Sequence, residues 1–127
     1  MGSLLREIVI DCADPGVVSA FWRKVLGWEV QSEVQSGIQW FWMMAPGADE
    51  DKDLSLVFLP VPEAKAFKNR LHIDVSPTGC SQADELARLL SLGAVQIDVG
   101  QGEQPWIVLA DPEGNEFCLL HNRVGEA

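Results

Sequence analysis

Two kinds of hydrophobic pattern alternate along this chain. After Asp14-Pro15, and again within 81–92, apolar residues recur three and four positions apart, which predicts amphipathic helices. Asp suits a helix start because its side chain accepts backbone N–H bonds, and Pro lacks a donor that would be unpaired anyway. Gly27 and Gly93 suit the left-handed conformation in which helices commonly end. The apolar positions are Val17, Val18, Phe21, Trp22, Val25 and Leu26 in the first helix. In the second helix we expect a buried side made of Ala83, Leu86, Ala87, Leu89 and Leu90.

Shorter runs of β-branched and aromatic residues predict strands around both helices. In chain order the expected strands are residues 4–12, 28–34, 38–44, 54–59, 71–76, 94–99, 105–110 and 116–121. The segment 111–115, Asp-Pro-Glu-Gly-Asn, predicts a tight turn between the last two strands, because each of its residue types is compatible with a reversal.

The order strand–helix–strand–strand–strand therefore occurs twice. Ile10-Asp11 recurs 63 positions later as Ile73-Asp74, and Leu26-Gly27 recurs 66 positions later as Leu92-Gly93. We therefore expect an α+β fold made of two βαβββ modules, at about 4–60 and 69–122. With 127 residues the chain has the length of one domain, which we expect to cover 1–127.

Four segments resemble the vicinal oxygen chelate superfamily, which includes glyoxalase I, bleomycin-resistance proteins and extradiol dioxygenases. Residues 8–15 and 21–30 resemble its first module, and residues 69–75 and 108–117 resemble its second. The resemblance implies that each module curls into a half-barrel and that two modules enclose a ligand cavity. It also implies a homodimer, and it leaves open whether modules pair within one chain or across the dimer.

The resemblance also locates the positions at which metal-dependent members bind their ion. Carried over residue by residue, these positions fall on Glu7, Leu56, His72 and Cys118. Leu56 cannot bind a metal, Glu7 stands where a His or Gln is usual, and Cys118 stands where a Glu is usual. We therefore expect no metal cofactor. The alternative is a three-ligand site made of Glu7, His72 and Cys118, which could hold Zn²⁺ with one open position.

Alternation along the strands indicates which other side chains face the cavity. If Glu7 points inward, Asp11 does so too, and if His72 points inward, Asp74 accompanies it. Burying several ionisable groups is costly unless they are paired or hydrated, so this set favours a polar, hydrated site. The alternative is structural: Asp11 and Asp74 lie near strand ends and bind the backbone or an arginine such as Arg70.

Three tryptophans are candidates for the walls of this cavity. Trp40 and Trp42 share one face of the third strand, and Trp106 lies on the corresponding strand of the second module. Indole rings can stack on a flat ligand or hold a cation against their faces. Together with the residues above, the expected ligand-binding set is Glu7, Asp11, Trp40, Trp42, Leu56, His72, Asp74, Trp106 and Cys118.

Composition excludes several classes of protein. Hydrophobic residues make up 47% and charged residues 22%, which excludes a disordered chain. The formal charge of −10 argues against nucleic-acid binding, which needs a basic surface. No apolar stretch is long enough to span a membrane. The cysteines Cys12, Cys80 and Cys118 are odd in number and have no CxxC spacing, so we expect reduced thiols and a cytoplasmic protein.

Three functional hypotheses follow. The first is a metal-free protein that binds a small organic molecule and sequesters an antibiotic or toxin, as bleomycin-resistance relatives do. The second is an enzyme of glyoxalase or isomerase type, with Glu7 or Asp11 as general base and His72 as acid or metal ligand. The third is a structural or regulatory domain whose interior is filled by its own side chains. The sequence leaves open whether the protein is an enzyme.

Overall fold

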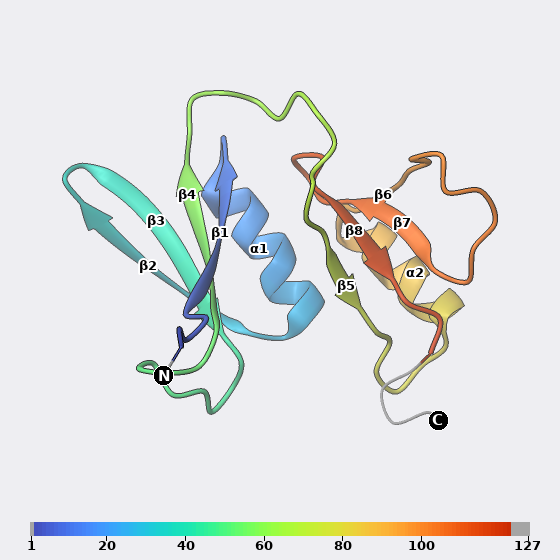
Figure 1. Cartoon of the computed structure of the whole chain (residues 1–127), viewed down its shortest axis with the longest axis horizontal. Coiled ribbons are helices and arrows are strands. Elements are labelled where there is room, and N and C mark those ends of the chain that lie inside the picture. Colours follow the sequence, from blue (N-terminus) through green and yellow to red (C-terminus); the bar gives the residue numbers. More distant parts are fainter. Residues whose placement is uncertain (1, 123–127) are drawn as a thin grey trace. The chain divides into compact units, whose positions relative to one another are not determined.

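A computed structural model describes residues 2–122, which divide into two compact units on either side of the Ala64–Lys65 bond (Figure 1). Each unit contains one βαβββ module. The first contains β1 (Glu7–Cys12), α1 (Pro15–Leu26), β2 (Glu29–Gln35), β3 (Ile38–Met44) and β4 (Ser55–Pro60). The second contains β5 (Ile73–Val75), α2 (Gln82–Leu92), β6 (Val95–Gln96), β7 (Ile107–Ala110) and β8 (Glu116–Leu119). The predicted α+β fold of two modules is confirmed.

The first unit forms a four-stranded sheet in the order β1-β4-β3-β2. β1 runs parallel to β4, and the other neighbours are antiparallel. α1 packs against this sheet and supplies much of the core, where Trp22 meets Phe21 edge-on with ring centroids 5.4 Å apart. Phe58 and Met43 complete this core from the sheet, each at most 1% exposed. Burial of such large side chains is the main stabilising contribution to the unit.

The second unit repeats this arrangement, with strand order β5-β8-β7-β6 and a parallel β5–β8 pair. Its fully buried side chains include Leu89 from α2, Leu109 from β7, and Phe117 and Leu119 from β8. The turn between β7 and β8 closes as predicted. The Gly114 N–H donates to the Asp111 carbonyl at 2.9 Å, and the Asp111 N–H donates to the Asn115 carbonyl at 2.9 Å.

The structure confirms the cap predicted at Asp14 and the helix ends predicted at Gly27 and Gly93, and it shows that Ser81, which was expected inside the second helix, is its N-cap. The Asp14 carboxylate accepts from the Val17 N–H at 3.2 Å, and the Ser81 hydroxyl accepts from the Asp84 N–H at 3.1 Å. Gly27 ends α1 with φ of 71°, a backbone conformation that costs glycine little and other residues more. Within residues 2–122, no helix has the length and apolar character needed to cross a membrane.

The strand predicted at 94–99 is much shorter in the structure, where β6 covers only Val95–Gln96. Beyond this point, side chains accept hydrogen bonds from backbone N–H groups. Asp98 accepts from the Gly100 N–H at 2.7 Å, and Gln101 accepts from the Val99 N–H at 2.9 Å. Such local bonds compete with a strand ladder. They turn the chain into a loop that later contributes to a cavity.

The buried side predicted for α2 is wrong in part. Ala83 and Ala87 are exposed and Leu90 is 43% exposed, whereas the helix buries Leu89 and the acidic Glu85. The Arg88 guanidinium donates to the two carboxylate oxygens of Glu85 at 2.8 Å and 3.1 Å. This pairing compensates for the burial of the Glu85 charge. Hydrophobic periodicity located the helix but not its buried acid, although the i,i+3 spacing of Glu85 and Arg88 is a local signal for this ion pair.

Candidate functional site

Strand register separates the two faces of the first sheet. Val57 lies opposite Trp42 on β3, so these side chains share the face away from α1. Leu56 lies opposite Ile8 and Met43 and is 4% exposed. Its side chain therefore belongs to the packed face, and the expectation that Leu56 lines the cavity is wrong. Leu56 had been carried over from the family resemblance, and an offset of one residue along a strand places a side chain on the opposite face of the sheet.

Trp40 and Trp42 form one wall of a cavity of about 210 Å³ in the first unit. Their ring centroids lie 5.0 Å apart with 32° between the ring planes. We call this cavity the tryptophan cavity; it is lined by Arg6, Glu7, Trp40, Trp42, Met44, Glu50, Asp53, Ser55 and Val57. Glu7 of β1 and the two indoles of β3, which the sequence had indicated separately as cavity residues, thus line the same cavity.

Charge at the tryptophan cavity is mainly negative. Glu7, Glu50 and Asp53 line it, against one cation, Arg6, which donates to the Glu50 carbonyl at 3.0 Å. Asp11 is not among the lining residues. It lies opposite Leu59 near the far end of β1, two ladder positions beyond the Val9–Val57 pair. The cavity can therefore offer carboxylates and π faces to a ligand, both of which favour a cation.

The second unit has a cavity of about 320 Å³ on the equivalent face of its sheet. We call it the cysteine cavity; its lining residues are Lys68, His72, Asp74, Val99, Gln101, Trp106, Val108, Glu116, Cys118 and Leu120. Register explains this set, because Cys118 of β8 lies opposite Asp74 on one side and Val108 on the other. The predicted candidates His72, Asp74, Trp106 and Cys118 all belong to it.

His72, Asp74 and Cys118 bring three possible metal ligands together. His72 Nε2 lies 3.1 Å from Asp74 Oδ1, so the imidazole takes the role that the sequence had suggested for Arg70. One donor atom from each of the three residues lies within 4.8 Å of the others. Burial raises the pKa of the Cys118 thiol, and the adjacent Asp74 carboxylate raises it further, although Lys68 acts in the opposite direction. The ligand-free thiol is therefore protonated at neutral pH.

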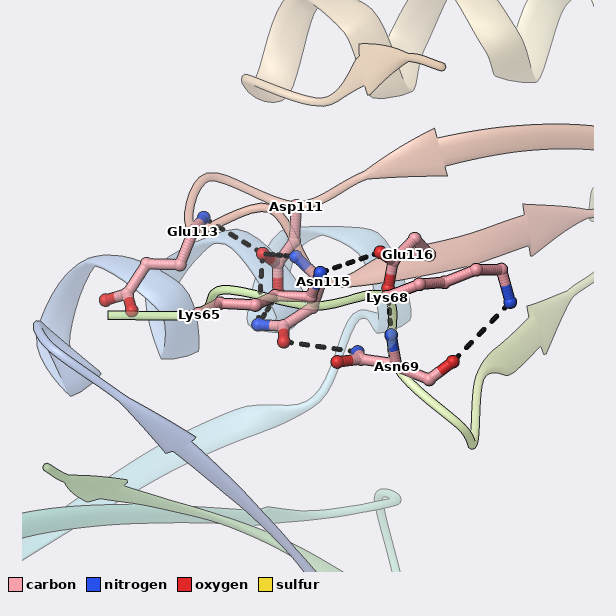
Figure 2. A network of polar contacts seen from close by, with 7 residues as sticks. All are labelled: Lys65, Lys68, Asn69, Asp111, Glu113, Asn115 and Glu116. Carbon is pink, nitrogen blue, oxygen red and sulfur yellow. Dashed lines mark hydrogen bonds and ion pairs between the residues drawn. The ribbon is translucent and has the colours of Figure 1, made fainter. Parts of the chain in front are cut away.

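A polar network holds the segment that leads into His72 (Figure 2). Lys65 Nζ lies 2.7 Å from a Glu116 carboxylate oxygen, and the Asn69 N–H donates to the other oxygen at 2.9 Å. The Asn69 amide also donates to the Asn115 side-chain carbonyl at 3.2 Å. Through these contacts, residues 65–69 are fastened to the start of β8. The network therefore sets where β5 and its cavity residues begin.

Replacing Glu116 by glutamine should lower the free energy of unfolding by about 1–2 kcal/mol, because two hydrogen bonds to a charged acceptor weaken. Burial raises the pKa of Glu116, but the bonds from Lys65 and Asn69 outweigh it and leave the pKa below its ordinary 4.5. A carboxyl whose pKa is lowered by folding stabilises the protein above its unfolded pKa and loses this effect as pH falls. Urea titrations should therefore show the full difference in the free energy of unfolding between Glu116→Gln and the unmodified protein at neutral pH. This difference should become smaller below about pH 4. A difference that is independent of pH would contradict this account.

Sequence reasoning missed several lining residues for identifiable reasons. Glu116 on β8 and Leu120, just past the end of that strand, each lie two positions from Cys118, so alternation alone could have found them. Val99 had been expected at the end of a strand and Gln101 had no predicted structure; both reach the cavity from the loop that follows β6. Lys68 comes from the segment before β5, for which no pattern indicated a direction.

Comparison with known proteins identifies the family. A family model described as a glyoxalase-like domain matches residues 7–120, which include nearly all of the described structure. The chain belongs to the glyoxalase-like domain family. This places it in the vicinal oxygen chelate superfamily, as its sequence segments had indicated. No curated protein matches the glyoxalase-like chain by sequence.

Solved structures support the same fold. The fosfomycin resistance protein FosX from Listeria monocytogenes, a mutant form complexed with Mn(II) and a dihydroxypropylphosphonic acid, is 16% identical with a TM-score of 0.72. The match covers 98% of this chain and 96% of that one. A glyoxalase/bleomycin resistance protein/dioxygenase family enzyme from Burkholderia phytofirmans is 20% identical with a TM-score of 0.62, covering 92% and 97% respectively. At these identities the likeness shows the fold and leaves the function open.

Proposed function

We propose that this glyoxalase-like protein binds a small, flat organic molecule in the tryptophan cavity, without a metal ion in that cavity. The observation that carries the proposal is the Trp40–Trp42 pair, whose two indoles lie 5.0 Å apart beside a cavity of about 210 Å³. Small-molecule sites are commonly concave and aromatic-lined, with a few polar groups that orient the ligand. Glu7, which lines the same cavity, supplies such a group.

The charges favour a cationic ligand. Three carboxylates and one guanidinium line the cavity, and the whole chain carries a formal charge of −10. A cation would gain both from the carboxylates and from the π faces of the indoles. Sequestration of an antibiotic or toxin of this kind is the biological role that we propose. Cys12, Cys80 and Cys118 are present as thiols, which supports a reducing compartment, the cytoplasm, as the place where it acts.

Calorimetric titration with N-methylquinolinium, a planar cation, and with neutral quinoline tests this function. We expect the cation to bind several-fold more tightly than its neutral counterpart. Trp42→Ala should weaken binding of the cation by about 1–3 kcal/mol. This is the binding free energy lost when an aromatic side chain that stacks on a nucleic-acid base, a flat ring of similar size, is replaced by alanine. Glu7→Gln should have a smaller effect, since one carboxylate among three is neutralised.

The matched control is Trp28→Phe, which changes a tryptophan that does not line the cavity. It should bind N-methylquinolinium as the unmodified protein does. Equal weakening by Trp28→Phe and Trp42→Ala would indicate a general structural effect. If Trp42→Ala bound N-methylquinolinium with unchanged affinity, the proposal that the two tryptophans bind the ligand would be overturned.

A second candidate is an enzyme of glyoxalase or isomerase type. The position of Glu7 at a cavity, together with the clustered His72, Asp74 and Cys118 in the other module, favours it. In that case Glu7→Gln should abolish turnover of an isomerisable thiol adduct while leaving its binding nearly intact. Asp11→Asn is the matched control, because Asp11 lies outside the lining of both cavities.

A further inference from the structure

The cysteine cavity contains the one group of three or more metal-binding side chains found within residues 2–122. Its members come from one sheet: Asp74 and Cys118 are directly opposite each other in the parallel β5–β8 ladder. His72 lies two positions before Asp74, so its side chain emerges on the same face. Adjacent strands hold these three groups in fixed register. The cluster is thus built by the backbone of a single module.

The spacing of the donor atoms suits a small ion. All three lie within 4.8 Å of one another, and His72 and Asp74 are already 3.1 Å apart. Given Zn–N and Zn–O distances of about 2.0–2.2 Å and Zn–S of about 2.3 Å, ligand atoms on a tetrahedral zinc lie roughly 3.3–3.8 Å apart. Metal binding would require these side chains to rotate toward a common point. His72 and Asp74 are half-exposed, which leaves them free to move.

The chemistry of the donors decides which ion fits. Cys118 offers a soft sulfur, His72 an imidazole nitrogen and Asp74 a single hard oxygen donor. Thiolate and imidazole favour Zn²⁺ and Co²⁺, whereas Mn²⁺ favours sites made of carboxylates, carbonyls and water. FosX, which shares this fold, was solved with Mn(II). The donor set of the present chain does not suit that ion.

We propose that His72, Asp74 and Cys118 form a zinc site within the second module, which binds thiophilic divalent ions and discriminates against Mn²⁺. Three protein ligands leave a fourth tetrahedral position open to the cavity of about 320 Å³, where water or an exogenous ligand can bind. The set differs from the three-ligand alternative drawn from the sequence, because Asp74 takes the place of Glu7. The site depends on no residue of the first module.

Titration of the full chain with Co²⁺ tests the site through the thiolate itself. A Cys118–Co²⁺ bond should produce an intense sulfur-to-cobalt charge-transfer band in the near ultraviolet, at one equivalent of metal. Zn²⁺ should displace the cobalt and abolish the band, and a hundredfold excess of Mn²⁺ should leave it unchanged. Absence of the band, or displacement of cobalt by Mn²⁺, would overturn the proposal.

Variants assign the band to its residues. Cys118→Ser should abolish the band, and Cys80→Ser, which changes a cysteine outside the cluster, should retain it. His72→Ala and Asp74→Asn should each weaken Co²⁺ binding by at least tenfold. Circular dichroism checks that every variant is folded, and Asp74→Asn, with nearly the same side-chain volume, tests the ligand if His72→Ala fails to fold. A band that persists in Cys118→Ser, or disappears in Cys80→Ser, would assign the metal to another site.

Discussion

Replacing Trp22 by alanine should lower the free energy of unfolding by about 3–5 kcal/mol. The indole is 1% exposed, meets Phe21 edge-on at 5.4 Å, and lies on the side of α1 that packs against the first sheet. Its removal leaves a cavity that the rigid sheet cannot fill. Domains have a total stability of roughly 5–15 kcal/mol, so this loss would be visible in any urea titration followed by circular dichroism.

Val34→Ala is the matched control in the same unit. Val34 is 68% exposed on β2, so its truncation should change the free energy of unfolding by less than about 0.5 kcal/mol. A loss below about 1 kcal/mol in Trp22→Ala would contradict the position of this indole at the centre of the core.

The corresponding substitution in the second unit, Phe117→Ala, tests whether the modules unfold together. Phe117 is fully buried on β8, so a similar loss of about 3–5 kcal/mol is expected. If residues 1–127 form one cooperative domain, as the sequence predicts, both variants should shift a single transition. Two transitions, each moved by only one variant, would contradict the prediction of a single domain.

Replacing Asp111 by alanine should lower the free energy of unfolding by about 2–4 kcal/mol. Asp111 is 3% exposed, and its carboxylate accepts from the Glu113 N–H at 2.9 Å and the Asn115 N–H at 3.0 Å (Figure 2). The Asn115 side-chain amide adds contacts at 3.0 Å and 3.2 Å. Alanine would leave these half-buried donors without their charged acceptor, and such groups are costly to leave unsatisfied.

Asp111→Asn should cost less than Asp111→Ala, because its amide oxygen can still accept a backbone bond. The matched control is Asp98→Ala, which removes a similar bond to the Gly100 N–H from an exposed loop and should cost less than about 0.5 kcal/mol. Thermal unfolding of the three variants ranks them. If Asp111→Ala and Asp98→Ala lost the same stability, burial of the Asp111 hydrogen bonds would make no additional contribution to the stability of the protein.

Much of the fold could be predicted from the sequence because its signals are local. The cap at Asp14, the glycine at position 27 and the turn at 111–115 act within a few residues, and each is found where the sequence indicated it. Local signals failed where a segment could form either a strand or a loop held by its own side chains. Beyond Gln96, side-chain bonds from Asp98 and Gln101 replaced the expected ladder, which no periodicity could reveal.

The candidate site was predicted less completely, because a cavity collects residues that are distant in sequence. Alternation correctly grouped Trp40 with Trp42, and Asp74 with His72. Leu56 had been placed in the cavity by the family resemblance alone, and the register of β4 against β3 shows that its side chain takes the other face. Asp11 illustrates a different limit: the correct face does not bring a residue to the cavity when it lies at the other end of the strand.

The sequence by itself determined the duplicated βαβββ order and the approximate boundaries of most elements, because these depend on periodicity, capping and turn residues that act over short stretches. The family was indicated separately, by the resemblance of four segments to known members. Only the tertiary structure decided that Asp74 joins His72 and Cys118, because their proximity depends on the β5–β8 register. It likewise decided that Glu116, held by Lys65 and Asn69, fastens the segment before His72. Contacts between strands far apart along the chain carry this information, and no local pattern encodes them.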